Sequence, residues 1–236
     1  EDTNGTFVVG SNTGGLAIVS PDSSIRSFSV KEGLSSNVTY SARTDKEGVV
    51  WIATSDGIGR LENGSIFNFS KKDGLPQESV FDIVEDDQGY CWLPVAKGII
   101  RVQKKQLNDY KEGKIKTIDW KLYDKNEDLI KSECTGSTRM FKDSDGNLWF
   151  LMLAGLVVVD PSDIQTNKLA PNVFIESLSA DDKEADLTTD IVIPAGKQRV
   201  AFTFTALSLR YPKSARYKYK LNNFDRDWVD AGKERQ

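Results

Sequence analysis

Two groups of oxygen-bearing side chains could do chemistry in this chain: the consecutive carboxylates 85–87, and the set Asp143, Asp145 and Asn147. Paired carboxylates can hydrolyse a glycosidic bond, and alternating oxygen ligands can bind Ca²⁺. Both groups, however, lie on an Asp-x-x-Gly turn that recurs along the chain, and the Asp of such a turn accepts hydrogen bonds from its own backbone. We therefore interpret both groups as structural, and we predict neither a catalytic residue nor a metal site.

Histidine is absent from the 236 residues. Its absence excludes Ser-His-Asp and Cys-His catalysis, histidine-ligated zinc or haem, and a phosphoacceptor histidine from this piece. Cys91 and Cys134 fall in different repeats beside expected strands, so we expect two buried free thiols, with a disulfide as the open alternative. No cofactor is predicted.

The net charge is −4, with acidic and basic residues interleaved, which argues against a nucleic-acid partner. The hydrophobic content of 39% is sufficient for a real core. No run of 18 apolar residues is present, and the first residues lack the basic and apolar segments of a signal peptide. We expect a soluble piece whose link to a membrane, if any, lies in segments outside it.

The recurring turns belong to a repeat. Residues 33–61 and 74–102 share three landmarks at a constant offset of 41 residues, namely a Gly-Leu step, a tryptophan and a second glycine. A third copy has Asp143, Gly146, Trp149 and Gly155, all displaced by 57 from the second copy. We expect the extra length, residues 103–128, to be an insertion between blades. Its Trp120 and Tyr123 indicate either an added strand or aromatic rings presented to a ligand.

A period near 40 residues with strand-type content predicts a β-propeller, in which each repeat is one four-stranded blade. Trp51, Trp92 and Trp149 hold the same place in each copy, and we interpret them as core residues between neighbouring sheets. Residues 6–19 read as the tail of an earlier copy, with Phe7 near the tryptophan position. The first domain, 1–160, is thus predicted to contain three to four blades, too few to close a ring alone.

The repeat pattern ends at Asp160-Pro161. Residues 161–172 read as a linker, and 173–236 contain apolar alternations typical of a β-sandwich, at 173–178, 191–193, 200–204 and 217–221. Four or five strands are fewer than a sandwich normally has, so we expect this domain to be incomplete at its C-terminus. The predicted fold class is all-β: a partial β-propeller followed by a truncated Ig-like β-sandwich.

Residues 33–61, GLSSNVTYSARTDKEGVVWIATSDGIGRL, resemble the two-component regulator propeller repeat, whose pattern runs Gly-Leu, a small-polar-Asn step, Asp-x-x-Gly, Trp-Ile-x-Thr and a closing Gly-Leu. The second and third copies depart from it at the Ala53-Thr54 pair. Residues 170–232 resemble the triple-tyrosine (Y_Y_Y) domain, with residues on its motif at Tyr217, Tyr219, Leu221, Phe224, Asp225 and Trp228.

The two motifs in this order resemble the periplasmic sensor region of a hybrid two-component system histidine kinase, anchored in the inner membrane. The resemblance implies a propeller that recognises an oligosaccharide, a Y_Y_Y domain that relays the event across the membrane and associates as a homodimer, and control of carbohydrate-utilisation genes by a kinase elsewhere in the parent chain. Two other classes stay open: a propeller lyase or glycosidase, and a protein-interaction scaffold.

The candidate ligand-binding residues lie on the Gly-Leu loops, which vary in polar content at equivalent positions, and on the extra-length segment. Such variation on one face suits recognition of sugar hydroxyls, although these loops could simply join the blades. An arginine there would suit an anionic sugar. The predicted set is Ser36, Asn37, Gln77, Glu78, Trp120, Glu133 and Arg139.

Overall fold

The computed structural model describes residues 4–124, 133–164, 172–181, 183–188, 191–192, 199–206 and 217–232. Strands dominate these residues, and one short α-helix accompanies them, so the predicted all-β fold class is confirmed. The chain divides into two compact units, Glu1–Ile164 and Gln165–Gln236. The predicted linker, 161–172, spans this division, and most of it (165–171) lies outside the described residues.

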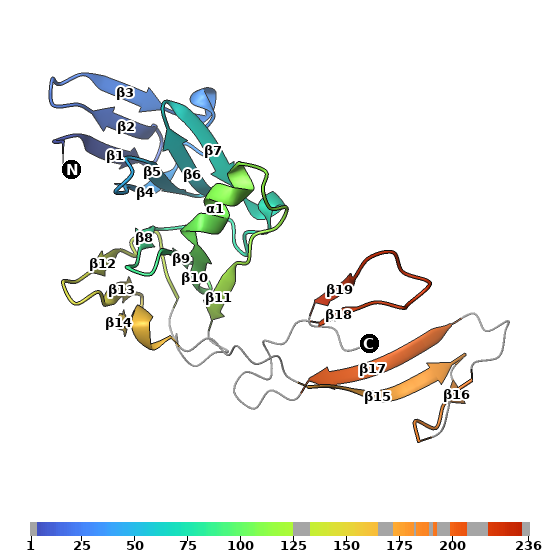
Figure 1. Cartoon of the computed structure of the whole chain (residues 1–236). Coiled ribbons are helices and arrows are strands. Elements are labelled where there is room, and N and C mark those ends of the chain that lie inside the picture. Colours follow the sequence, from blue (N-terminus) through green and yellow to red (C-terminus); the bar gives the residue numbers. More distant parts are fainter. Residues whose placement is uncertain are drawn as a thin grey trace. The chain divides into compact units, whose positions relative to one another are not determined.

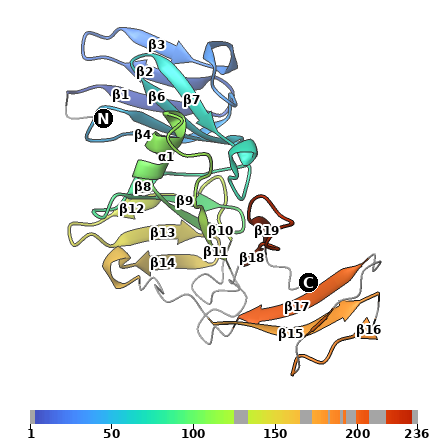
Figure 2. The same ribbon diagram turned by 45° about the vertical axis from the view of Figure 1, so that its right-hand side comes forward.

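The described residues of the first unit form four antiparallel sheets, each built from strands that are consecutive in the chain, which is the topology of propeller blades. Figures 1 and 2 show these sheets following one another in chain order. We call them blades 1 to 4. Blade 1 has β1 (Phe7–Ser11), β2 (Gly15–Val19) and β3 (Ile25–Phe28); blade 2 has β4 (Thr39–Thr44), β5 (Val50–Thr54), β6 (Gly57–Glu62) and β7 (Ser65–Phe69); blade 3 has β8 (Val84–Glu85), β9 (Tyr90–Val95), β10 (Gly98–Gln103) and β11 (Lys121–Asp124); blade 4 has β12 (Met140–Lys142), β13 (Leu148–Met152) and β14 (Gly155–Val159).

The blades pack through alternating faces of their strands, because successive side chains of a strand point to opposite sides. In β5, Val50 and Ile52 join a buried cluster with Leu16 and Phe28 of blade 1. Trp51, between them in sequence, joins a second cluster with residues of blade 3. A third cluster joins blades 3 and 4 and contains Trp92, Tyr123, Leu148 and Phe150. Each junction therefore contains a buried apolar cluster formed by the two facing sheets.

The three tryptophans are each anchored by the Asp of the preceding turn. Trp51 Nε1 donates to Asp45 Oδ2 (2.8 Å), and the equivalent bonds in blades 3 and 4 measure 2.8 Å (Trp92 to Asp86) and 2.7 Å (Trp149 to Asp143). The other carboxylate oxygen of each Asp accepts two backbone N–H groups of its own turn. The Asp of each turn thus accepts hydrogen bonds from its own backbone, as we predicted. Trp51 and Trp92 are buried, whereas Trp149 is half-buried.

The extra residues that separate the second copy from the third lie inside blade 3, not between blades as we predicted. They connect β10 to β11 and carry helix α1 (Lys104–Lys111), where blade 2 has only the two-residue turn Asn63-Gly64. Tyr123 is in the added strand β11 and stacks on Trp92 (ring centroids 6.0 Å apart), the place that Phe69 takes against Trp51 in blade 2. The strand interpretation of this segment is therefore confirmed for Tyr123.

Blade 1 follows the same register, with one shift from our expectation. In blade 2, Trp51 pairs with Arg60, and in blade 1 the equivalent pair is Val8 with Ile18. Val8, next to Phe7, is therefore the residue at the tryptophan position. Val8 packs against the cluster shared with blade 2, while Phe7 is 49% exposed. The reason is the two-fold periodicity of a strand, which sends neighbouring residues to opposite faces.

The Gly-Leu loops begin with short 3₁₀ helices, η1 (Val30–Glu32) and η2 (Lys71–Asp73). Each has a capping box, formed by Ser29 with Glu32 and by Ser70 with Asp73. The glycines that follow have φ of 99° and 83°, which the absence of a Cβ permits. These loops lie at one end of the strands, which we call the loop edge. The Asp-x-x-Gly turns and the β6–β7 and β10–β11 connections lie at the other end of the strands, which we call the turn edge.

Asp82 connects three blades near their first strands. Its fully buried carboxylate accepts hydrogen bonds from Ser41 Oγ (2.6 Å) and Arg43 Nε (3.1 Å) of blade 2, and from the Met140 N–H (2.9 Å) of blade 4. Arg43 Nη2 also donates to the Met140 carbonyl (2.9 Å). A buried charge is tolerated when it is paired and hydrogen-bonded in this way.

The described residues of the second unit form two small antiparallel sheets. One has β16 (Lys183–Glu184), β15 (Val173–Ala180) and β17 (Val200–Ala206), and the other has β18 (Tyr217–Tyr219) and β19 (Val229–Gly232). Tyr217 is buried against Phe204, Tyr219 contacts Phe202 edge to face, and Trp228 is 66% exposed. Ile191 and Val192 lie outside any strand, contrary to the predicted alternation there, and 193 lies outside the described residues.

Both cysteines are buried free thiols, as we expected. Desolvation by burial raises the pKa of Cys91 far above its usual range and that of Cys134 to about 11. No α-helix in the described part of the chain is long and apolar enough to span a bilayer.

Candidate functional site

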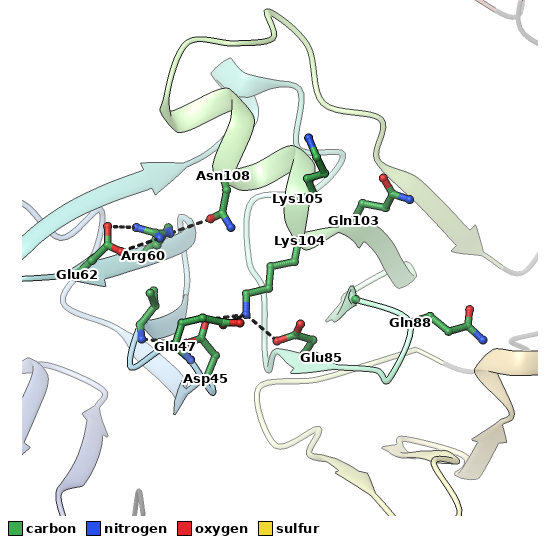
Figure 3. Close-up of a pocket in the computed structure, with 12 residues that line it drawn as sticks. Asp45, Glu47, Arg60, Glu62, Glu85, Gln88, Gln103, Lys104, Lys105 and Asn108 are labelled. Carbon is green, nitrogen blue, oxygen red and sulfur yellow. Dashed lines mark hydrogen bonds and ion pairs between the residues drawn. The ribbon is translucent and has the colours of Figure 1, made fainter. Parts of the chain in front are cut away.

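A cleft of about 540 Å³ opens at the turn edge between blades 2 and 3, beside α1 (Figure 3). It is lined by the β4–β5 turn and β6 of blade 2, by β8 and the β8–β9 turn of blade 3, and by the start of α1 with the residue before it. Because the lining includes the segment that replaces a two-residue turn, this cleft is a departure from the repeat. We define it as the blade 2–3 cleft.

Lys104, the first residue of α1, lies at the centre of the cleft. Its Nζ lies 2.8 Å from Asp45 Oδ2 and 2.9 Å from Glu85 Oε2, and it also pairs with Glu47 (Figure 3). These three carboxylates are close enough to hold a cation, and the lysine ammonium supplies the positive charge. Burial alone would lower the pKa of Lys104, but the hydrogen bonds to the three carboxylates outweigh it and raise the pKa above its ordinary value.

Asp45 therefore has two partners on one oxygen, Lys104 and the Trp51 indole. Desolvation raises the pKa of Asp45, but the hydrogen bonds from Lys104, from Trp51 and from the Val49 N–H lower it more, so that the net shift is downward. The carboxylate is held ionised, which stabilises both the turn and its contact with α1.

Arg60 forms the blade 2 side of the cleft. It is buried, lies 5.7 Å over the Trp51 ring, and makes a two-pronged ion pair with Glu62 (2.7 and 3.2 Å). Its Nε donates to Asn108 Oδ1 of α1 (3.1 Å). Lys111 of the same helix lies 2.8 Å from Glu62. The hydrogen bonds from Arg60, followed by that from Lys111, lower the pKa of Glu62 to about 2.

Two glutamines form the blade 3 side. Gln88 Oε1 accepts from Arg101 Nη2 (3.2 Å), and Gln103 Nε2 donates to the Tyr90 hydroxyl (3.0 Å). Arg101 is buried and lies 3.7 Å over the Tyr90 ring. The two amides are thus held by a guanidinium group and a phenol that contact each other.

The arrangement of groups in this cleft suits recognition of a ligand. A general acid at neutral pH needs a carboxyl group whose pKa is raised, whereas the pKa values of Asp45 and Glu62 are lowered. The charges that line the cleft all have ionic partners, and amide groups lie between them. Such a surface suits a polar ligand that both donates and accepts hydrogen bonds.

The predicted Gly-Leu loop residues lie on the opposite, loop edge. Asn37 and Glu78, 41 residues apart, hold the same place: the carbonyl oxygen of each accepts the N–H of a second-turn glycine in the preceding blade, Gly15 (2.8 Å) and Gly57 (2.6 Å). The Asn37 side chain accepts the Val30 N–H (2.9 Å), and Glu78 pairs with Lys71. These residues join blades, the alternative that we had left open for the loops.

The other predicted residues are also held by their own surroundings. Ser36 Oγ contacts Ser55 Oγ (2.8 Å), and Gln77 Nε2 donates to the Pro76 carbonyl (3.0 Å). Trp120 Nε1 donates to the Asp73 carbonyl (3.2 Å), and its ring packs against the blade 2–3 core. The guanidinium of Arg139 donates to carbonyls of its own loop, and the Glu133 carbonyl accepts the Leu153 N–H.

None of the predicted residues lines the blade 2–3 cleft, which consists of other residues. Sequence reasoning missed Arg60, Gln88, Gln103, Lys104 and Asn108. One signal was available: Arg60 and Arg101 are also 41 residues apart, and both lie over the tryptophan of their blade. The other signal was the lysine-rich sequence of the extra segment.

No family model and no curated protein match the chain. Among solved structures, it is similar over its whole length to the extracellular domain of a hybrid two-component system from B. thetaiotaomicron, with a TM-score of 0.71 at 21% identity. A second such extracellular domain from the same organism matches over the whole chain with a TM-score of 0.52 at 15% identity. The chain spans 32% and 38% of those two chains, about a third of their length. At these identities the likeness shows a shared fold.

Proposed function

We propose that this chain is part of the extracytoplasmic sensor region of a hybrid two-component system, and that this region recognises an oligosaccharide. The observation that supports the proposal is the likeness of the complete chain, both units in order, to the extracellular domain of such a system at a TM-score of 0.71. The resemblance of the repeats and of residues 170–232 to the propeller and Y_Y_Y motifs points the same way.

The remaining steps of the proposal follow from that role. The region lies in the periplasm as part of an inner-membrane protein. The second unit relays ligand binding towards the membrane and pairs with a second copy, and a kinase elsewhere in the parent protein controls genes of carbohydrate utilisation. The chain itself acts by binding; the lowered pKa values of Asp45 and Glu62 agree with a cleft that does not transfer protons.

Calorimetric titration of the full-length protein's extracellular region against a panel of plant and host oligosaccharides tests the proposal. The same mixtures are analysed for products by chromatography. Saturable binding of one oligosaccharide without new products is the expected result. Turnover would show an enzyme instead, and capture of a protein partner with no oligosaccharide bound would show an interaction scaffold.

A further inference from the structure

The blade 2–3 cleft exists because one blade carries a longer connection than its neighbour. Blade 2 closes its third and fourth strands with Asn63-Gly64, whereas blade 3 inserts α1 at the equivalent place. The helix is fixed to blade 2 by Lys104, by Asn108 and by Lys111, and Tyr110 Oη donates to Asp73 (2.8 Å). A rigid scaffold that presents an inserted segment is where binding residues concentrate.

The charged groups at this cleft already have partners. Lys104 has three carboxylates, Arg60 takes both oxygens of Glu62, and Lys105 pairs with Asp109 along the helix. A charged ligand would have to compete with one of these pairs, and removing one partner from a desolvated pair is costly. A neutral ligand meets no such cost.

Three side-chain amides at the cleft each use only one of their two polar atoms in a hydrogen bond within the described residues. Gln88 and Asn108 use their oxygen atoms to accept from Arg101 and Arg60, and Gln103 uses its nitrogen to donate to Tyr90. Among the described residues, no hydrogen bond is recorded for the other end of each amide. In Figure 3, Gln88 and Gln103 lie on one side of Lys104 and Asn108 on the other. Amides fixed at one end are pre-organised for a ligand at the other.

We propose that the blade 2–3 cleft binds a neutral saccharide, with the free amide nitrogens of Gln88 and Asn108 and the free amide oxygen of Gln103 paired to its hydroxyl groups. A sugar hydroxyl both donates and accepts, so it matches either end of an amide. The volume of about 540 Å³ falls in the range of small-molecule sites and accommodates a disaccharide unit. This inference rests on the proposed function and assigns its ligand class and position.

Two substitutions remove a donor and keep the acceptor that holds the side chain. Gln88→Glu retains the oxygen that accepts from Arg101, and Asn108→Asp retains the oxygen that accepts from Arg60. Gln106→Glu is the matched control: Gln106 is on the same helix, its oxygen accepts the Asp119 N–H (2.8 Å), and it does not line the cleft. Should Asn108→Asp fail to fold, Gln88→Glu, outside the helix, still carries the test.

The 236-residue chain is titrated with cellobiose, maltose and mannobiose, and with digalacturonic acid as the charged probe. We expect one neutral disaccharide to bind, about tenfold more weakly to Gln88→Glu and to Asn108→Asp, and with unchanged affinity to Gln106→Glu. Equal binding by all four proteins, or binding of the charged probe alone, would overturn the inference and leave the sensor role standing.

The full-length protein separates the two hypotheses further. If it binds an oligosaccharide and Gln88→Glu and Asn108→Asp leave that affinity unchanged, the cleft is not the site, and the inference fails while the proposed function holds. If neither protein binds any member of the wider panel, both fail.

Discussion

Lys104 Nζ lies 2.8 Å from Asp45 Oδ2, the same oxygen that accepts the indole N–H of Trp51. One carboxylate thus connects a helix of blade 3 with the turn and the core tryptophan of blade 2. The repeated Asp-Trp pair is present in three blades, but the described residues place a lysine on it only in blade 2.

Replacing Lys104 by methionine should destabilise the fold by about 3 kcal/mol, because Asp45, Glu47 and Glu85 would be left facing one another without a cation. Urea denaturation followed by circular dichroism measures the change. Lys105→Met is the matched control: the Lys105 side chain is 78% exposed and its ion pair lies along its own helix, so its loss should cost less than about 0.5 kcal/mol. Equal effects of the two substitutions would contradict the central role of Lys104.

Stability should be nearly constant between about pH 5.5 and 8, because the chain has no histidine, and should fall in acid. The folded-state pKa values of Glu62 (about 2, against a usual 4.5), Asp45 and Asp143 are lowered, so below their usual values the unfolded chain binds more protons. Their stabilisation is complete above about pH 5 and is lost as the pH falls towards the folded-state values.

Thermal unfolding midpoints recorded from neutral pH down to about pH 2.5 check this decline. In Glu62→Gln, residue 62 no longer titrates. The unfolding midpoint of this variant should therefore be lower at neutral pH and should fall less steeply as the pH decreases. A stability maximum below pH 4 would show that these carboxylates are not stabilised in their ionised form.

Asp82→Ala should cost about 3 to 5 kcal/mol, since it leaves Arg43, Ser41 and the Met140 N–H without their common acceptor. Asp87→Ala, which removes a largely exposed partner of Lys142, should change the free energy of unfolding by less than about 1 kcal/mol. The comparison by urea denaturation separates the burial of Asp82 from a general effect of lost negative charge. Similar midpoints for both variants would exclude Asp82 as the connection among three blades.

Gly57→Ala should destabilise by about 3 kcal/mol, because a Cβ there would lie 2.0 Å from the Phe69 carbonyl oxygen and the residue has φ of 85°. Gly48 has a similar φ of 82° but open space around it, so Gly48→Ala should show only the backbone strain, about 1 kcal/mol. The difference in unfolding midpoint between the two variants measures the contact alone. A smaller effect at Gly57 than at Gly48 would contradict the close approach of β6 to the last strand of its blade.

Much of the first unit could be predicted from the sequence because its landmarks repeat. The Asp turn, the tryptophan and the second glycine recur at constant spacing, and each serves the same local geometry, so reading one copy determines the others. The place of the extra segment was not predictable in this way, since helix α1 (Lys104–Lys111), which separates β10 from β11, has no counterpart in the described residues of the other blades.

The cleft escaped prediction for a different reason. Lys104 meets Asp45 and Glu47 only because two blades pack face to face, and sequence spacing does not encode which turn a long side chain will reach. The polar loop residues drew attention instead, because varied polar side chains at equivalent positions resemble a recognition surface. Asn37 shows that such a residue also has a structural part: its amide oxygen accepts the Val30 N–H of its own loop, and its carbonyl accepts the Gly15 N–H of blade 1.

The connection between β10 and β11 has a wider consequence. Ile99 faces Tyr123 across the pair as Ile58 faces Phe69 in blade 2, so the strands keep their alignment although the segment between them is far longer. A hairpin whose alignment survives such a replacement is a natural grafting point. The Asn63-Gly64 turn should therefore accept a foreign peptide, such as a binding loop or a reporter epitope, while the surrounding blades fold unchanged.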